Sequence, residues 1–339
     1  MSNFSIKLLA WSDKHGRTNL PWQSKPNSHT NVYHIWLSEI MLQQTQVSTV
    51  IDYFKKFIRY FPSLIDLANA SEDAVLAQWA GLGYYARARN LQKTAQIIVQ
   101  QHGGEFPQDF EQILALPGIG RSTAGAILSL GFNQNHAILD GNVKRALARI
   151  HQIKGHYSQS VTLNKLWHLA ELHTPNTRNN QYTQAIMDLG ATICTRTQPK
   201  CPHCPMTNLC LSYKNQTQAL YPEPKPQKTK PSRSIAMLVF SNNNDIYLQK
   251  RPSKGIWGGL WSFIECDDTP LSIQKSIDEF DQSASIIRHL SVFKHTFTHY
   301  HLYIHPVVVD CPSAHVEFYQ IKELHLGVPK PVTRIISQL

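Results

Sequence analysis

A proline- and lysine-rich stretch at residues 221–233 constrains this chain most, because it separates two parts with different hydrophobic periods. Its sequence, "YPEPKPQKTKPSR", cannot pack a core and predicts an extended linker. Before it, apolar residues recur every three or four positions, as in helices; after it, β-prone and alternating runs prevail. We therefore expect two domains, residues 1–220 and 234–339, and 339 residues suffice for a core in each.

The part before the linker is expected to be all-α. Its amphipathic segments lie around residues 32–60, 71–80, 86–102, 110–116, 121–130, 143–151, 160–173 and 181–193. The part after the linker is expected to be α+β. Residues 234–252 predict two strands joined by an Asn/Asp turn, residues 295–310 alternate like a strand, and residues 271–281 predict a helix.

The charge balance indicates a polyanionic partner. The formal net charge is +10 and the pI is about 9.3, which is typical of proteins that bind nucleic acid. There is no run of 18 apolar residues, and the N-terminal residues lack the features of a signal peptide. We therefore expect a cytoplasmic protein that does not enter the membrane.

Four of the six cysteines lie within 17 residues. They are Cys194, Cys201, Cys204 and Cys210, with the spacing C-x6-C-x2-C-x5-C. Clustered cysteines in a cytosolic chain indicate a metal site rather than disulfides. Both Zn²⁺ and an iron–sulfur cluster fit four thiolates, and the single C-x2-C pair favours the cluster, because zinc sites usually contain two such pairs.

A glycine turn within "LALPGIGRSTAGAILSL" (114–130) joins two expected helices. Gly118 and Gly120 allow backbone N–H groups to converge where the second helix begins, near Ser122. Such a helix N-terminus can bind a phosphate. An ordinary helical hairpin explains the same residues.

Glu39, in "WLSEIMLQQTQV", lies on the flank of a helical apolar stripe that runs from Val32 to Phe61. Burial against Trp36 and Ile40 would raise its pKa and favour the protonated form. A glutamate on the surface is the alternative interpretation.

Asp140, in "AILDGNVKRALARI", precedes a helix that we expect to begin at Val143. Asp140 or Asn142 would be the N-cap of this helix, which is the structural interpretation of the motif. A carboxylate at this end of the helix would also accept backbone N–H bonds and stay ionised. Two carboxyl groups whose environments push their pKa values apart suit glycosidic-bond hydrolysis. In a basic protein, that chemistry points to the N-glycosidic bond of a nucleotide flipped out of the duplex.

A flipped nucleotide leaves a gap that protein side chains must fill. Gln43 and Gln44, and Tyr84 beside Arg87 and Arg89, supply amide, aromatic and basic groups for this purpose. Core packing is the alternative role for Tyr84 and its neighbour, and we expect at least one of this pair in the core.

These motifs together resemble the helix-hairpin-helix DNA glycosylases, and specifically adenine DNA glycosylases of the MutY type. The resemblance covers essentially the whole chain, with its motifs in order. It implies that the four cysteines hold a [4Fe–4S] cluster. It also implies that Glu39 protonates the flipped adenine through N7, that Asp140 stabilises or captures the sugar cation, and that Asn142 helps to hold the sugar cation.

The resemblance implies further contacts with DNA. Leu20 and Trp22 would form walls of the adenine pocket, although residues 23–34 are longer than the resemblance leads us to expect. The part after the linker is similar to a MutT-like domain that recognises 8-oxoguanine, here with threonine in place of a more usual serine. The residues that would contact the mispair are Gln43, Gln44, Tyr84, Phe297, Thr298 and His299.

Ser122 separates two activities within the wider superfamily. Endonuclease III-like enzymes have a lysine there that forms a Schiff base, whereas serine cannot form an imine. The resemblance therefore implies a mainly monofunctional enzyme, a monomer that acts on duplex DNA with adenine opposite 8-oxoguanine or guanine. Lys144 is a neighbouring amine that could trap the opened sugar.

The alternatives are an endonuclease III-like glycosylase/lyase for oxidised pyrimidines, and an iron–sulfur DNA-binding protein without catalysis. The acidic helix that binds Mg²⁺ in MutT-like pyrophosphatases is replaced by "QKSIDEFD", so we expect no pyrophosphatase activity.

Overall fold

The structure, a computed structural model, describes residues 2–23, 30–225, 229–243, 245–312, 317–321 and 326–339. The chain forms two compact units: Met1–Asn69 with Asn90–Pro226, and Ala70–Arg89 with Gln227–Leu339. Residues 24–29 of the long 23–34 segment and residues 226–228 of the expected linker lie outside the described residues. The domain limits at 220 and 234 stay a prediction.

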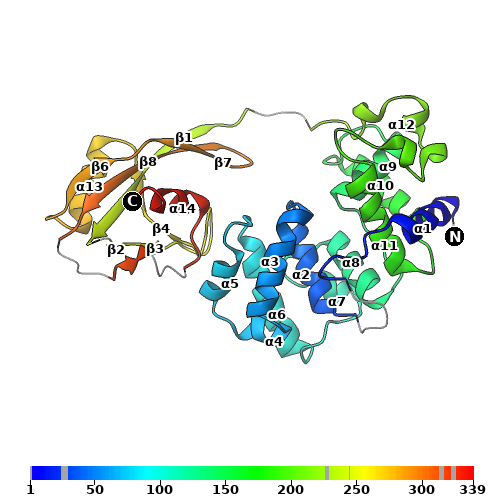
Figure 1. Ribbon diagram of the computed structural model, residues 1–339, viewed down its shortest axis with the longest axis horizontal. Coiled ribbons are helices and arrows are strands. Elements are labelled where there is room, and N and C mark those ends of the chain that lie inside the picture. Colours follow the sequence, from blue (N-terminus) through cyan, green and yellow to red (C-terminus); the bar gives the residue numbers. More distant parts are fainter. Residues whose placement is uncertain (1, 24–29, 226–228, 244, 313–316, 322–325) are drawn as a thin grey trace. The chain divides into compact units, whose positions relative to one another are not determined.

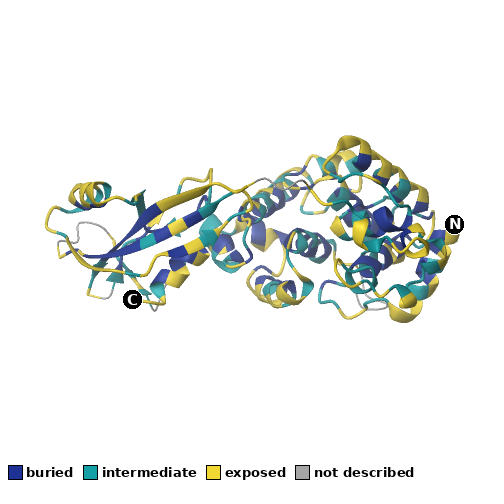
Figure 2. Ribbon diagram, turned by 90° about the horizontal axis from the view of Figure 1, so that it is seen from above, coloured by how far each residue is buried: buried dark blue, intermediate teal, exposed yellow. Residues whose placement is uncertain are grey.

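The first unit is helical, as the sequence predicted (Figure 1). Its helices and the helix that continues into it are α1 (Asn3–His15), α2 (Val32–Leu42), α3 (Val47–Tyr60), α4 (Leu64–Asn69), α6 (Ala86–Gln101), α7 (Phe110–Leu114), α8 (Arg121–Phe132), α9 (Gly141–Ile150), α10 (Ser160–His173), α11 (Asn179–Asp188) and α12 (Leu211–Lys214). Buried residues lie on their inward sides and exposed residues on their outward sides (Figure 2). Within the described part of the chain, no helix is both long and apolar enough to cross a membrane.

The apolar stripe from residue 32 to 61 is divided between two helices, which corrects the prediction of one continuous run. Helix α2 ends at Leu42 and α3 begins at Val47. Gln44 lies between them with a φ of 60°, a left-handed conformation that interrupts the helix. The sequence period misses this break because both helices bury one face and the connection is short. Helices α1 and α4 were not predicted.

The second unit contains a seven-stranded sheet in the order β6-β8-β1-β2-β9, with β5 paired to β1 and β7 paired to β8. A two-stranded β3-β4 sheet accompanies it. The elements are α5 (Glu72–Trp79), β1 (Ser232–Asn242), β2 (Asp245–Ile246), β3 (Gln249–Lys250), β4 (Trp261–Ser262), β5 (Ile264–Asp267), α13 (Pro270–Phe280), β6 (Ser285–His289), β7 (Phe293–Thr296), β8 (His301–Asp310), β9 (Tyr319–Gln320) and α14 (Lys330–Ile336).

Alternate residues of β1 face opposite layers of this unit. Ile235, Met237 and Val239 belong to a core cluster with Val332 and Ile335 of α14. The residues between them, Ala236, Leu238 and Phe240, pack with Ile273 and Ile277 of α13. The two helices therefore cover the two faces of the sheet, as Figure 1 shows.

The predicted helix at 271–281 is confirmed as α13, and the predicted turn between two strands is confirmed by the pairing of Asn242 with Asp245. The alternating run at 295–310 is not one strand. It is the end of β7 and all of β8, which pair antiparallel with Phe293 opposite Ile304 and Thr296 opposite His301. Residues 297–300 form the turn of this hairpin.

Candidate active site

Glu39 lies in α2 among buried residues, and its carboxyl group interacts with the charge of Asp140. Burial raises the pKa of Glu39 to about 7, and the negative charge of Asp140 contributes to the increase. This confirms the direction predicted from the sequence. Loss of hydration is the larger of these two causes, because burial disfavours the charged form of a carboxyl group.

Asp140, one of the two predicted candidates, is the N-cap of α9, which begins at Gly141 rather than at the expected Val143 because the cap lies directly before it. Its Oδ1 accepts a 2.7 Å hydrogen bond from the Val143 backbone N–H, and its Oδ2 accepts a 3.2 Å bond from the Asn142 side-chain amide. Burial nevertheless raises the pKa of Asp140 and outweighs these hydrogen bonds, whereas the sequence led us to expect only the stabilisation of the ionised form. These hydrogen bonds and the charge of Arg145 favour the ionised form of Asp140 and oppose the effect of its burial.

Arg145 connects this carboxylate to the start of the cysteine loop. Its Nη2 donates to Asn142 Oδ1 at 2.9 Å and to the Gly190 carbonyl at 2.7 Å, and its Nε donates to the Cys194 carbonyl at 2.8 Å. Gly190 belongs to a π-helical turn, Leu189–Ile193, that packs against the start of α9. A Cβ at this glycine would lie 2.6 Å from the Cβ of Asn142, so no side chain fits there.

The predicted glycine turn joins α7 to α8. Gly118 has a φ of 77°, and a Cβ there would lie 2.9 Å from the Asn90 Cβ, so the turn requires glycine. The Thr94 hydroxyl donates to the Pro117 carbonyl at 2.9 Å, and Gly120 is the N-cap of α8. The hairpin therefore presents the N-terminus of α8 on a fixed support.

Ser122 has a structural contact that the sequence did not reveal. Its hydroxyl accepts a 2.9 Å hydrogen bond from the Leu139 backbone N–H. This bond fixes the residue directly before Asp140 against the start of α8. Lys144, the nearby amine, has a pKa lowered by partial burial, which the charge of Asp140 opposes.

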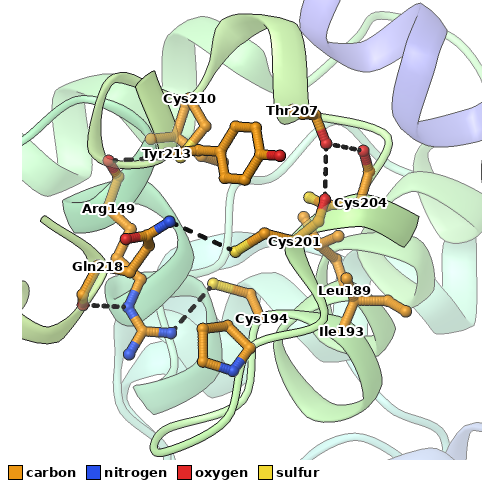
Figure 3. Close-up of a pocket in the computed structure, with 12 residues that line it drawn as sticks. Arg149, Leu189, Ile193, Cys194, Cys201, Cys204, Thr207, Cys210, Tyr213 and Gln218 are labelled. Carbon is orange, nitrogen blue, oxygen red and sulfur yellow. Dashed lines mark hydrogen bonds between the residues drawn. The ribbon is translucent and has the colours of Figure 1, made fainter. Parts of the chain in front are cut away.

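The four clustered cysteines come together around one pocket (Figure 3). Burial, followed by the charges of the neighbouring thiolates, raises the pKa of Cys204 to about 12. Four thiolates at this place therefore require a positively charged group, as a metal or an iron–sulfur cluster supplies. Their number and chemistry fit a cluster, although no three His, Cys, Asp or Glu side chains in the described part of the chain are arranged for a single metal ion.

Arg149, one turn after Arg145 on α9, holds the cysteine loop. It is 4% exposed. Its Nη1 donates to the Thr195 carbonyl at 2.6 Å and lies 3.5 Å from Cys194 Sγ. Its remaining donors reach one carbonyl group within the loop, that of Arg196, and two after it, those of Gln218 and Tyr221.

The roles of both arginines were not predicted from the sequence, although a usable signal was present for Arg149. An arginine inside the apolar run "ALARI" cannot point to water when its neighbours on the helix are buried. A buried guanidinium needs acceptors, and the polar loop that follows α11 was the available source.

Gln44 and Tyr84, both predicted to contact the mispair, have left-handed backbones with φ values of 60° and 50°. Such conformations are uncommon for residues other than glycine and often mark functional sites. Gln44 is exposed and Tyr84 is 46% exposed, whereas Tyr85 is buried, so one tyrosine of the pair is in the core as expected. Gln43 is the C-cap of α2.

Trp22 lines a pocket of the first unit, but Leu20 is not among the residues that line it. Trp22 is 6% exposed and packs its edge against Phe54, with ring centroids 5.5 Å apart. The same pocket is lined by Arg17 and Gln184, which the sequence analysis did not identify.

Asp188 holds Arg17 and Gln184, two residues that line this pocket, in place. Its Oδ2 accepts the Arg17 backbone N–H at 2.7 Å, and its Oδ1 accepts from Arg17 Nε at 2.8 Å and from Gln184 Nε2 at 2.7 Å. The Asp188 side chain is 1% exposed. The loop that carries Trp22 is therefore fixed to the end of α11.

A pocket of the second unit brings together four predicted residues from distant parts of the sequence. Its walls include Tyr84, Phe297, Thr298 and His299. Arg89 donates a hydrogen bond to the Gly258 carbonyl, which closes one side. In the first unit the predicted site residues thus include the carboxyl pair, the cysteine pocket and Trp22 in its pocket, and in the second unit they include the residues that line this pocket.

Comparisons with known proteins agree with this arrangement. Residues 37–171 match the HhH-GPD superfamily base excision DNA repair protein model, and residues 235–338 match the NUDIX domain model. The chain is 38% identical over 343 residues to the adenine DNA glycosylase of Buchnera aphidicola subsp. Acyrthosiphon pisum, with 98% of this chain and 97% of the relative covered. It is 40% identical over 348 residues to that of Buchnera aphidicola subsp. Baizongia pistaciae, with 99% and 96% covered.

A solved structure supports the fold of the helical part. The structure of a thermostable thymine-DNA glycosylase matches with a TM-score of 0.53 and 27% identity, covering 62% of this chain and 95% of that one.

Proposed function

Because the chain belongs to the adenine DNA glycosylases, base-excision-repair enzymes, we propose that it releases adenine paired with 8-oxoguanine or guanine in duplex DNA. The product is an abasic site. The observation that carries this proposal is the pair of desolvated carboxyl groups, Glu39 with its pKa raised to about 7 and Asp140 with hydrogen-bond donors.

The two carboxyl groups divide the work of breaking the glycosidic bond. Protonated Glu39 donates its proton to the flipped adenine, at N7, so that the base leaves with the electron pair of the C1′–N9 bond. Ionised Asp140 then stabilises the positive charge on the sugar until water adds to C1′. Asn142 orients Asp140 by donating to its Oδ2 at 3.2 Å.

The hairpin and the exposed residues hold the duplex in this scheme. The N-terminus of α8, with Gly118 and Gly120 before it, binds a backbone phosphate. Gln43, Gln44 and Tyr84 fill the space that the flipped nucleotide leaves, and Trp22, with Leu20 nearby, bounds the adenine. Thr298 and His299, with Phe297 packed behind them, recognise the base opposite. The pocket that these three residues line together with Tyr84 supports this role.

Cys194, Cys201, Cys204 and Cys210 would hold a [4Fe–4S] cluster, which supplies a rigid cross-link for the loop between α11 and α12. Arg149 and Arg145 then connect that loop to the helix that carries Asp140 at its start.

We expect base release without rapid strand cleavage, because Ser122 supplies no amine for a Schiff base. A duplex panel with each base opposite 8-oxoguanine or guanine tests this, with cleavage scored before and after alkali. Adenine release that gives breaks only after alkali supports the proposal. Release of oxidised pyrimidines with breaks before alkali would instead support a glycosylase/lyase, with Lys144 as the candidate amine.

Freshly purified protein is expected to contain about four iron and four sulfide per chain, as a [4Fe–4S] cluster requires. Iron and acid-labile sulfide analysis, with zinc measured in the same sample, checks this. Replacing Cys204 by serine should lower the iron content, whereas replacing Cys266, which lies in β5 outside this pocket, should not. Stoichiometric zinc without sulfide would overturn the cluster.

A further inference from the structure

The turn between β7 and β8 exposes two residues at its tip. The Phe297 backbone N–H donates to the Tyr300 carbonyl at 2.9 Å, which closes the turn around Thr298 and His299. Both tip residues are exposed. Lys230 Nζ donates to the Phe297 carbonyl at 2.9 Å and braces the turn from outside. The tip is therefore the part of this turn that can meet a base.

Phe297 points back from the tip into a cluster of rings. Its ring centroid lies 4.6 Å from that of His295, 4.7 Å from that of Tyr300 and 5.3 Å from that of Trp257. The Trp257 and His295 rings are 5.6 Å apart. Because these rings surround Phe297, we infer that its position fixes the position of the tip next to it.

Trp257 reaches this cluster at a conformational cost. Its φ is 54°, which is unfavourable for a bulky residue and persists only when the surroundings enforce it. One glycine on each side of Trp257, Gly255 before it and Gly259 after it, also has a positive φ, of 93° and 77° respectively. At Gly258, a Cβ would lie 2.4 Å from the Ser253 carbonyl oxygen, so the loop closes tightly behind the indole.

Other groups keep the indole in place. The Arg251 guanidinium lies 5.7 Å from the centre of the Trp257 ring and is paired with Glu265. The loop around Trp257 and the tip residues line the same pocket. A strained backbone, a tight glycine loop and a cluster of rings thus converge behind Thr298 and His299.

We propose that Trp257 is a positioning residue that sets the preference for 8-oxoguanine over guanine opposite the adenine. This inference rests on the proposed function. The two purines differ only at C8 and N7, where 8-oxoguanine has an added carbonyl and an N–H. Hydrogen bonds to such a small difference depend on distance and angle, so the tip must be held within a fraction of an ångström.

The test compares Trp257→Ala, Trp257→Phe and wild-type full-length protein on duplexes with adenine opposite 8-oxoguanine or guanine. Single-turnover rates are measured over a range of enzyme concentrations. We expect Trp257→Ala to reduce the preference by about tenfold, since each aromatic contact contributes a modest amount. The loss should appear in the half-saturating concentration for the 8-oxoguanine duplex, not in the saturating rate. Trp257→Phe should restore most of the preference.

A double variant tests whether Trp257 acts through the tip. Thr298→Ala should reduce the preference in wild-type protein but change it little when combined with Trp257→Ala, because both act on the same contact. Fully additive losses would overturn the assignment.

Tyr247→Ala is the matched control. Tyr247 belongs to a comparable ring cluster with Phe280 and Phe318, on the α13 side of the sheet. It should lower stability to a similar degree without changing the preference. An unchanged preference in Trp257→Ala, or an equal loss in Tyr247→Ala, overturns the inference; a wild-type protein that releases no adenine overturns the proposed function instead.

Discussion

Replacing Glu39 by glutamine should lower the rate of adenine release by about a thousandfold, because glutamine fills the same space but has no acidic proton to donate. The measurement is a single-turnover assay on a duplex with adenine opposite 8-oxoguanine. Binding to that duplex, measured by fluorescence anisotropy, should persist. Release near the wild-type rate would remove Glu39 from the role of acid.

The wild-type rate should also depend on pH in one direction. Because the pKa of Glu39 is raised to about 7, its proton is present below that pH and is lost above it. The rate should therefore fall as pH increases from about 7 to 9. A flat profile over this range would contradict protonation by Glu39.

The raised pKa of Glu39 can also be tested without substrate, through the pH dependence of protein stability. A carboxyl group whose pKa is raised on folding stabilises the protein fully below its unfolded pKa, and this stabilisation is lost as pH rises through about 7. The loss is on the order of 3 kcal/mol at most. Glu39→Gln lacks it and should gain in Tm over wild type as pH rises. Glu105→Gln, at an exposed position, should show no such trend.

Replacing Arg149 by methionine should destabilise the cysteine loop severely. The change removes the donors to the carbonyl groups of Thr195, Arg196, Gln218 and Tyr221. A buried acceptor that loses its donor costs about 1–3 kcal/mol, so the expected loss is several kcal/mol in total. At about 2–4 °C per kcal/mol, Tm should fall by roughly 10 °C or more.

Iron content and proteolysis separate this effect from general instability. Arg149→Met should contain less iron per chain and should be cut within residues 194–221 under mild protease treatment. Arg149→Lys should recover little, because one ammonium group cannot replace a guanidinium that reaches several carbonyls. Arg59→Met, an exposed replacement on α3, is the control. Normal Tm and iron content in Arg149→Met would show that the loop is held by other groups.

The sequence predicted most of the helices, the turn at Gly118, the cap at Asp140 and the raised pKa of Glu39. These features depend on local chemistry, namely period, glycine and capping, which a short stretch of residues reveals. The break at Gln44 and the hairpin within residues 295–310 escaped prediction, because the apolar period continues through both.

The apolar run around Arg149 signals that this arginine is buried, but the partners of Arg145, Arg149 and Asp188 do not follow from local pattern. Each depends on partners about 45 to 171 positions away along the chain. The sign of the Asp140 pKa shift failed for a related reason, since its burial arises from the packing of distant helices and outweighs the local hydrogen bonds.

The close packing at Gly190 limits which substitutions this position can accept during evolution. Even alanine would push against the Cβ and backbone of Asn142, 2.6 Å and 3.0 Å away, and would displace the start of α9 together with the Asp140 carboxylate. Gly190 takes no part in the chemistry, yet its position should tolerate as few substitutions as those of Glu39 and Asp140.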